Sequence, residues 1–221
     1  MRIEVGTETI SAEYEPAVGT QSAIFVLAHG AGGSMNDRGI RAVAEVMRAV
    51  GLGVVRFNFP YSEKGRGGPD PMPKLTATVA AVAAQVRTER GTKGLIIGGR
   101  SMGGRAASML AADGFKADGL LLLAYPLHPP GQLDKLRDAH LPSITMPVLC
   151  FNGTRDTFCE QRLMARALES VKTKWTMHWL DGADHGFHVL KSSGRTDADV
   201  LGEVATATTA WLETLSTPTS R

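Results

Sequence analysis

A serine placed between glycines is the first candidate for chemistry in this sequence. Gly99, Ser101 and Gly103 form a G-x-S-x-G pattern that directly follows an apolar run, 95–98, and directly precedes a segment with helical spacing. A sharp turn from strand to helix holds such a serine in a strained conformation and points its hydroxyl away from the sheet. Gly99 and Gly103 have no Cβ atoms, so the neighbouring strand and helix can approach closely. The pattern predicts that Ser101 is a nucleophile.

A serine hydroxyl needs a base that takes its proton and an acid that orients the base. His185 lies in a turn-like stretch after the last predicted strand, and Asp156 follows the fifth one. Both therefore fall at carboxyl ends of strands, on the same edge of the sheet as Ser101. His188 ranks second as the base. Asp184 is interpreted as a turn residue, because a side chain next to the histidine in sequence reaches its ring poorly.

Attack by a serine on a carbonyl group also needs donors for the negative oxygen that forms. The backbone N–H of Met102, which follows the serine, is one candidate. The other is expected from the glycine loop 29–33, with Ala31 first and Gly32 as the alternative. His29 is expected to orient this loop. A phosphate cradle is the competing interpretation, but the loop has neither the dinucleotide-binding spacing nor the Lys-Ser/Thr ending of a P-loop.

Four residues are candidates for lining a pocket around these groups. Gly30 and Gly32 belong to the glycine loop, His128 to an irregular segment, and Arg100 to the turn that carries the serine. Arg100 and Arg105 can attract an anionic substrate, but pairing with nearby carboxylates is the favoured interpretation. Metal-binding spacings such as H-E-x-x-H or paired C-x-x-C are missing from the sequence, so we expect neither a metal nor another cofactor.

The elements that must position these residues alternate along the chain. Apolar runs separated by helical patterns predict a doubly wound, mostly parallel sheet of about six to eight strands with helices on both faces. An antiparallel hairpin, Arg2–Val5 with Ser11–Tyr14, is expected at one edge. The strands are expected at 24–28, 54–59, 94–98, 120–124, 148–151 and 175–180, and the helices at 37–50, 73–86, 102–112, 163–168 and 200–215. Residues 61–72, rich in glycine, proline and charge, are expected to form a surface loop.

Length and composition set the outer limits. The 221 residues are expected to form one domain, 1–221, in which 125–146 is a short, proline-rich, irregular flap rather than a helical cap. A formal net charge of +2 argues against nucleic acid or an anionic membrane as partners. The sequence contains no run of 18 apolar residues and no apolar leader at its start, so a cytoplasmic location is expected. The two cysteines are too few for a disulfide framework.

The motifs together resemble those of the α/β-hydrolase superfamily. The resemblance rests on residues 29–33, 99–105, 153–156 and the pair Asp184-His185, and it spans nearly the whole chain. The strings at 98–107 and 124–130 resemble a dienelactone-hydrolase-like branch, similar to bacterial relatives of the testis-expressed hydrolase-like proteins. The resemblance implies the fold and the triad Ser101, Asp156 and His185. Dienelactone hydrolases proper use a cysteine nucleophile, so the serine argues against that activity here.

These residues predict a serine hydrolase that cleaves a small carboxylic ester or thioester through an acyl-enzyme intermediate. Acyl transfer and amide or peptide hydrolysis on the same triad are the first alternatives. The second is a non-catalytic interaction module that keeps the fold, since fold alone does not fix function. The expected partner is a small-molecule substrate, and the oligomeric state stays open.

Overall fold

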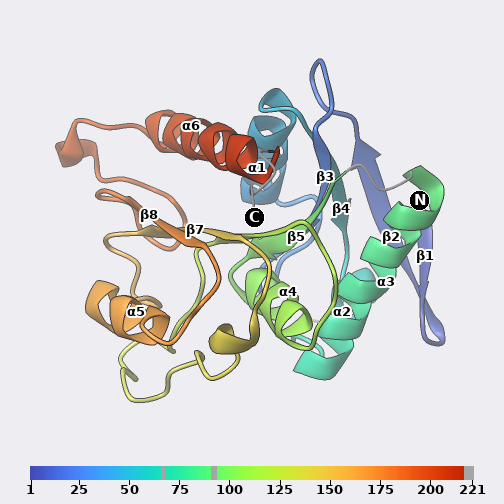
Figure 1. Cartoon of the computed structure of the whole chain (residues 1–221), viewed down its shortest axis with the longest axis horizontal. Coiled ribbons are helices and arrows are strands. Elements are labelled where there is room, and N and C mark those ends of the chain that lie inside the picture. The colour runs from blue at the N-terminus through green and yellow to red at the C-terminus, as the bar shows by residue number, and fades with distance from the viewer. Residues whose placement is uncertain (66–67, 91–93, 217–221) are drawn as a thin grey trace, which may run out of the picture.

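A computed structural model describes residues 1–65, 68–90 and 94–216, and these form an eight-stranded sheet covered by helices on both faces (Figure 1). The strand order is β1-β2-β4-β3-β5-β6-β7-β8. The strands are β1 (Arg2–Val5), β2 (Glu8–Glu15), β3 (Ala23–Ala28), β4 (Leu52–Phe57), β5 (Leu95–Arg100), β6 (Gly119–Leu123), β7 (Val148–Gly153) and β8 (Trp175–Leu180). Strands β3 to β8 are parallel, whereas β1 and β2 form an antiparallel hairpin that pairs with β4. The predicted fold class and edge hairpin are confirmed.

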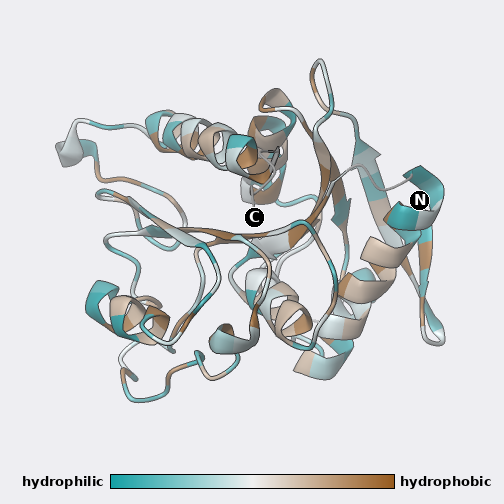
Figure 2. Ribbon diagram, viewed as in Figure 1, coloured by the Kyte–Doolittle hydropathy of each residue, from teal (hydrophilic) through white to brown (hydrophobic). Residues whose placement is uncertain are grey.

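The central strands are buried on both sides because their side chains are apolar on both faces. Every residue of β3, β4, β6 and β7 is buried, and Figure 2 shows hydrophobic colour along this central layer. A buried parallel strand appears in the sequence as a continuous apolar run, which explains why these strands could be predicted.

The helices are α1 (Arg38–Ala49), α2 (Pro60–Glu63), α3 (Met72–Arg90), α4 (Met102–Ala112), α5 (Gln161–Leu168) and α6 (Asp197–Ser216), with 3₁₀ turns η1 (Leu141–Ser143) and η2 (Lys191–Ser193).

Two hydrophobic cores lie on opposite faces of the sheet. One includes Phe25 of β3, Met47 of α1 and Trp211 of α6. The other packs the remaining face against α3, α4 and α5, with Val79 and Ala107 among its members. Figure 1 shows α1 and α6 above the sheet and α3, α4 and α5 below it. The sheet edge that carries the carboxyl ends of the parallel strands thus sits between two firmly packed layers.

The expected end of the strand at 54–59 is wrong. The strand expected over 54–59 ends at Phe57, and Pro60 begins the short helix α2 instead of only stopping a strand. Proline suits a first helical position because its φ is already fixed there and its missing N–H would have no partner. Phe59 and Tyr61 are buried on either side of it, against the ring of His29. Residues 61–63 are therefore helical, and residues 66–67 of the expected loop lie outside the described part of the chain.

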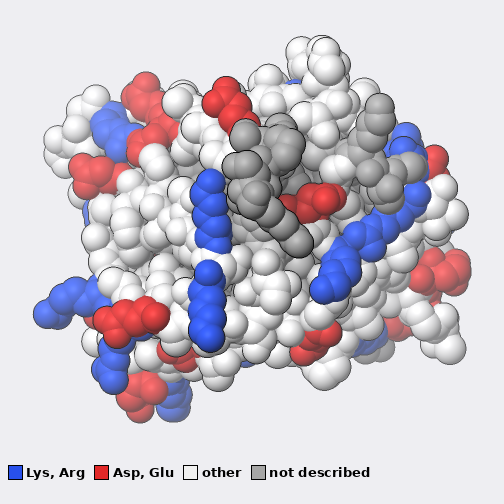
Figure 3. Space-filling model, viewed as in Figure 1, with Lys and Arg blue, Asp and Glu red and all other residues white. Residues whose placement is uncertain are grey.

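The segment between β6 and β7 contains no helix longer than the three-residue turn η1. It turns back on itself, because the Tyr125 hydroxyl donates a hydrogen bond to the Arg137 carbonyl oxygen at 2.5 Å. Its first residues, Tyr125 to His128, are buried. None of the helices in the described residues is long and apolar enough to cross a membrane. On the face drawn in Figure 3, acidic and basic side chains are interspersed, with no large patch of one sign.

Candidate active site

The turn between β5 and α4 holds Ser101 in a conformation that L-residues rarely adopt. Its φ is 50° and its ψ is −117°, and its N–H donates to the Leu123 carbonyl oxygen at 2.8 Å. The glycines beside it are required by sterics. A Cβ on Gly99 would lie 2.3 Å from the Ala28 carbonyl oxygen, and one on Gly103 would lie 2.5 Å from that of His29. The strand and helix therefore pack at a distance that only glycine permits, as expected.

Two further residues share this positive φ with Ser101. Ala124, with φ 52°, directly follows β6, and Phe187, with φ 64°, lies two residues after His185. Apart from glycines, these are the three positive-φ residues that the described structure contains. All three lie at one place in the fold. Strained residues collect at functional sites because the surrounding structure must hold them against their preferred conformations.

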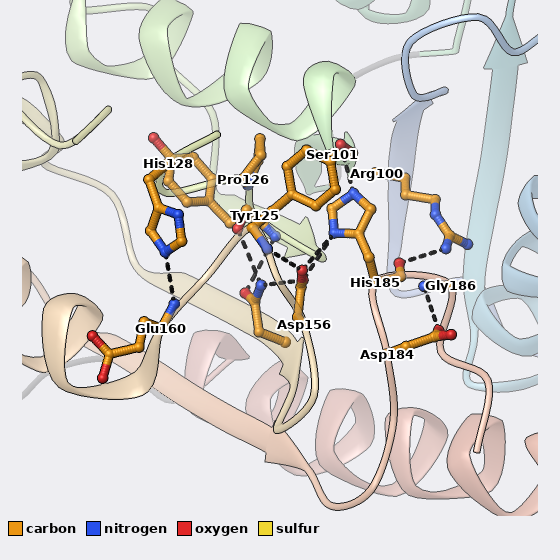
Figure 4. Close-up of polar contacts among 12 residues, drawn as sticks. Arg100, Ser101, Tyr125, Pro126, His128, Asp156, Glu160, Asp184, His185 and Gly186 are labelled. Carbon is orange, nitrogen blue, oxygen red and sulfur yellow. Dashed lines mark hydrogen bonds and ion pairs between the residues drawn. The ribbon is translucent and has the colours of Figure 1, made fainter. Parts of the chain in front are cut away.

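The three residues expected to form a triad meet at this edge of the sheet (Figure 4). His185 Nε2 lies 2.9 Å from Ser101 Oγ, and His185 Nδ1 lies 2.9 and 3.0 Å from the two oxygens of Asp156. The Asp156 side chain is fully buried, whereas that of His185 is 25% exposed. This places a base next to the nucleophile and an acid behind the base, which is the geometry of a serine nucleophile activated by histidine.

Asp156 is held by donors that the sequence analysis missed. The side-chain amide of Asn152 donates to Asp156 Oδ2 at 3.0 Å, and the backbone N–H of Phe158 donates to Oδ1 at 2.8 Å. Asn152 also bonds both the N–H and the carbonyl oxygen of Tyr125. A buried amide must find partners for all its polar atoms. The only sequence signal was a polar Asn152 directly after the apolar run 148–151.

The loop that carries the histidine is fixed by its own turn. Asp184 accepts hydrogen bonds from the backbone N–H groups of Gly186 at 2.7 Å and His188 at 3.0 Å, as expected of a turn residue. His188 is exposed and pairs with Asp197 at 2.7 Å, so it does not face the serine. The ring of Phe158 packs against that of His185, with centroids 4.3 Å apart. His185 is thus the histidine that the fold presents to Ser101.

The glycine loop after β3 is oriented by His29. The Phe59 N–H donates to His29 Nε2 at 3.2 Å, so this ring nitrogen is an acceptor and Nδ1 carries the hydrogen that binds the Gly30 carbonyl oxygen at 2.8 Å. Burial lowers the pKa of His29, which keeps the ring neutral. The Gly30 oxygen also accepts from the Gly33 N–H at 3.2 Å and closes a turn around Ala31.

The remaining candidates separate into two groups. Gly30, Ala31 and Arg100 line a cavity of about 570 Å³ beside the triad. His128, expected as a possible pocket residue, is not among its lining residues. It is buried, accepts from the Glu160 N–H at 3.0 Å and lies 3.0 Å from the Pro129 carbonyl oxygen through its other nitrogen. Its Nε2 contact thus joins the segment after β6 to the loop after β7, whereas its Nδ1 contact stays within its own segment.

Gly32 has a φ of +70° and is exposed, so it supplies the sharp turn of the glycine loop rather than a wall of that cavity. Within the residues that the structure describes, no three His, Cys, Asp or Glu side chains gather closely enough to hold a metal ion. Arg100 and Arg105 were expected to pair with nearby carboxylates, and this expectation is wrong. Neither Arg100 nor Arg105 lies within ion-pair distance of a carboxylate in the described chain.

Comparison with known proteins agrees with this architecture. The structure is similar to that of an α/β serine hydrolase homologue from Coxiella burnetii, with a TM-score of 0.76, 20% identity and coverage of 94% of this chain and 93% of that one. An α/β serine hydrolase without lid from Xanthomonas campestris gives a TM-score of 0.74, 21% identity and coverage of 96% and 93%. Dienelactone hydrolase from Anabaena variabilis gives a TM-score of 0.73 and 19% identity, and the match covers 96% of this chain and 95% of that one.

At these identities the solved structures establish the fold alone. The sequence itself also matches a family described as "Alpha/beta hydrolase domain", and the match covers residues 21–213. That range extends from just before β3 to the last turns of α6 and includes every residue of the Ser101 site. This chain therefore belongs to the alpha/beta hydrolase domain family.

Proposed function

We propose that this chain is a serine hydrolase that cleaves small carboxylic esters or thioesters through an acyl-enzyme intermediate. The observation that carries the proposal is the 2.9 Å distance between His185 Nε2 and Ser101 Oγ, with Asp156 bound to the opposite ring nitrogen. A serine hydroxyl is a weak nucleophile until a base removes its proton, and here the base is already in hydrogen-bond contact. The family membership supports a hydrolase.

In the first half of the reaction, Ser101 Oγ attacks the acyl carbon while its proton passes to His185 Nε2. The carbonyl oxygen becomes negative and receives hydrogen bonds from the N–H groups of Met102 and Ala31. Met102 stands at the start of α4, where the helix dipole also favours negative charge. Asp156 stabilises the imidazolium that forms. His185 then gives its proton to the leaving oxygen or sulfur, and the Ser101 acyl ester remains.

In the second half, His185 takes a proton from water, and the resulting hydroxide attacks the acyl carbon. The Ser101–acyl bond breaks, Oγ recovers the proton from His185, and a carboxylic acid leaves. Acyl transfer uses the same first half with an alcohol or amine in place of water. For a hydrolase, in contrast, we expect the free acid to stay the main product when an alcohol or amine is added.

The proposal is tested with p-nitrophenyl butyrate and the variant Ser101→Ala. Loss of the nucleophile of a triad removes most of its catalysis, so kcat is expected to fall at least about 1000-fold. The matched control is Ser22→Ala, which removes an exposed hydroxyl that binds the Gly51 carbonyl oxygen far from the turn. It is expected to keep wild-type turnover. Unchanged turnover by Ser101→Ala, with Ser22→Ala as active as the wild type, would contradict the proposal.

A further inference from the structure

The cavity beside the triad lies between α1, the start of α6, the glycine loop and the loop after His185. Its volume of about 570 Å³ is within the range of small-molecule sites. It begins next to the nucleophile, because a Cβ on the lining residue Gly30 would lie 3.7 Å from the Cβ of Ser101. Much of its wall is apolar and comes from Ile40, Val43, Phe187 and Leu201.

Arg100 places a guanidinium group in the wall of this cavity. Figure 4 shows its side chain on the opposite side of the His185 ring from Tyr125 and Pro126. Nη2 donates to the His185 carbonyl oxygen at 2.7 Å. Nη1 lies against Gly39 of α1, 3.1 Å from where a Cβ would stand. The guanidinium carbon lies 5.4 Å from the centroid of the Phe187 ring, so packing fixes this side chain.

The charge of Arg100 lacks a carboxylate partner in the described chain. Asp184, Asp156 and Asp37 are the acids that act on it through space, and each is already bonded elsewhere. Asp156 binds His185, and Asp184 accepts from two backbone N–H groups of its own loop. Asp37 stands at the start of α1, but its carboxylate accepts from the N–H and hydroxyl of Ser34.

Arg56 is a buried arginine whose charge is neutralised within the chain. Its side chain is 3% exposed, and it pairs with Glu15 at 2.7 Å and with Glu13 at 2.9 Å. Arg100 is also largely buried, and burial lowers its pKa because the charged form loses water without gaining an ion pair. A guanidinium has five N–H donors, and a carboxylate matches its fork with two parallel bonds. Arg100 therefore has capacity for an anion that the chain does not supply.

We propose that Arg100 anchors a carboxylate-binding subsite in this cavity, so that the preferred substrates are esters or thioesters that carry a second, unreacted carboxylate. This inference rests on the proposed hydrolase function. The apolar part of the cavity wall suits a short hydrocarbon link between the reacting carbonyl and that carboxylate. Either the acyl group or the leaving group can carry the anion, and separate substrate pairs distinguish the two.

The test compares kcat/KM for an anionic ester with that for a neutral ester of matched size. For the acyl side the pair is p-nitrophenyl hemiglutarate and p-nitrophenyl valerate. For the leaving-group side the pair is 4-acetoxybenzoate and its methyl ester. Each ratio is measured in the wild type and in Arg100→Gln, which keeps a donor for the His185 carbonyl but removes the charge. Arg105→Gln is the control, because it removes a nearby charge from α4, and Arg105 does not line the cavity.

We expect an anionic preference for at least one pair in the wild type, and a fall of about 10- to 100-fold in that ratio in Arg100→Gln. Arg100→Lys keeps the charge without the fork and is expected to be intermediate. Arg105→Gln is expected to keep most of the preference. A wild type without anionic preference for either pair, an unchanged ratio in Arg100→Gln, or an equal fall in Arg105→Gln would overturn the subsite.

Binding without turnover separates this inference from the proposed function. In the Ser101→Ala background, calorimetry with monomethyl glutarate and with neutral dimethyl glutarate is expected to show preference for the monoanion, and addition of Arg100→Gln is expected to abolish it. If the wild-type protein cleaves neither ester but the Ser101→Ala variant binds the monoanion through Arg100, the subsite is supported and the proposed hydrolase function is wrong. If the wild-type protein cleaves neutral esters but the Ser101→Ala variant binds both glutarate esters equally, only the subsite inference is wrong.

Discussion

The buried amide of Asn152 donates to Asp156 Oδ2 at 3.0 Å and bonds both backbone polar groups of Tyr125, so one side chain ties Asp156 to the chain just after β6. We expect Asn152→Leu to lower kcat about 10- to 100-fold with little change in KM, because the acid would lose a donor that fixes its position. The unfolding free energy should also fall by about 1–3 kcal/mol, since buried polar groups would lose partners.

Kinetics and urea denaturation of the purified variant check this prediction. Asn152→Asp is the companion variant, because it keeps the size of the side chain and an acceptor while replacing the donor with a second acid. A positioning role predicts that the fully folded fraction of either variant has reduced kcat. A loss of activity that merely follows the loss of folded protein, or a raised KM with normal kcat, would contradict it.

The contact between Gly103 and β3 predicts a large cost for one added methyl group. A Cβ at Gly103 would meet the backbone carbonyl oxygens of His29 and Ala28 at 2.5 and 2.7 Å, and backbone cannot move aside cheaply. Gly103→Ala should therefore lower the unfolding free energy by more than about 2 kcal/mol. Gly202 in the exposed face of α6 has nothing within 4 Å of such a Cβ, so Gly202→Ala should raise it by about 0.5–1 kcal/mol. Chemical denaturation of both variants checks these two predictions. Equal changes in the unfolding free energy would show that the close contact of Gly103 with the His29 and Ala28 carbonyl oxygens is unimportant.

The backbone strain at Ser101 predicts that this turn is held at a cost in stability. A non-glycine residue at φ 50° and ψ −117° is destabilised by about 1–3 kcal/mol. Ser101→Gly removes that strain, and Ser101→Ala keeps it while also lacking the hydroxyl. We expect the glycine variant to unfold at a higher temperature than the alanine variant by a few degrees. Calorimetry that finds the alanine variant equal or more stable would argue that the turn is unstrained.

His140 predicts a pH dependence of stability. Burial, and then the charge of Arg105, lowers the pKa of His140 to about 4, whereas an unfolded histidine titrates near about 6.5. The unfolded chain therefore binds more protons between these values, so the contribution to stability is complete above about pH 6.5 and is lost as the pH falls toward 4. His140→Gln keeps an N–H donor for Ser108 Oγ, which lies 2.8 Å from the ring nitrogen, but cannot titrate.

Denaturation midpoints measured from pH 7 to pH 4 check this prediction. The variant should lose less stability across the window than the wild type does. Part of the slope should remain in the variant, because burial also lowers the pKa of His29. Identical slopes in the two proteins would contradict the assignment to His140.

The sequence indicated the parallel strands and the positions of Ser101, Asp156 and His185 at the sheet edge, because both leave local signals. A strand buried on two faces is a continuous apolar run, and Ser101 and Asp156 each lie just past the carboxyl end of such a strand. His185 follows β8, which is only partly buried along most of its length but ends at the same edge of the sheet. The strand order leaves no local signal in the sequence, since it depends on the face of the sheet against which each connecting helix packs. The helix at Pro60 was missed for a similar reason, because the packing of Phe59 and Tyr61 on His29 selects it.

Side-chain roles were harder to predict than positions. His128 was expected at the pocket, but it is buried and accepts a hydrogen bond from the N–H of Glu160, which comes from a separate segment of the chain. Arg100 was expected to form an ion pair, and the structure gives its nearby carboxylates other donors. Asn152 carried no motif at all. Each of these outcomes depends on which groups from distant parts of the chain meet in space.

Covalent labelling of the nucleophile tests the central claim most directly. The wild-type chain is treated with a fluorophosphonate probe and digested, and the modified residue is located by mass spectrometry. Activation by His185 predicts one adduct, on Ser101, which is lost in Ser101→Ala and is slowed at least about 100-fold in His185→Ala. A folded wild-type protein that remains unlabelled, or that carries the adduct on another residue, would contradict the assignment of Ser101 as an activated nucleophile.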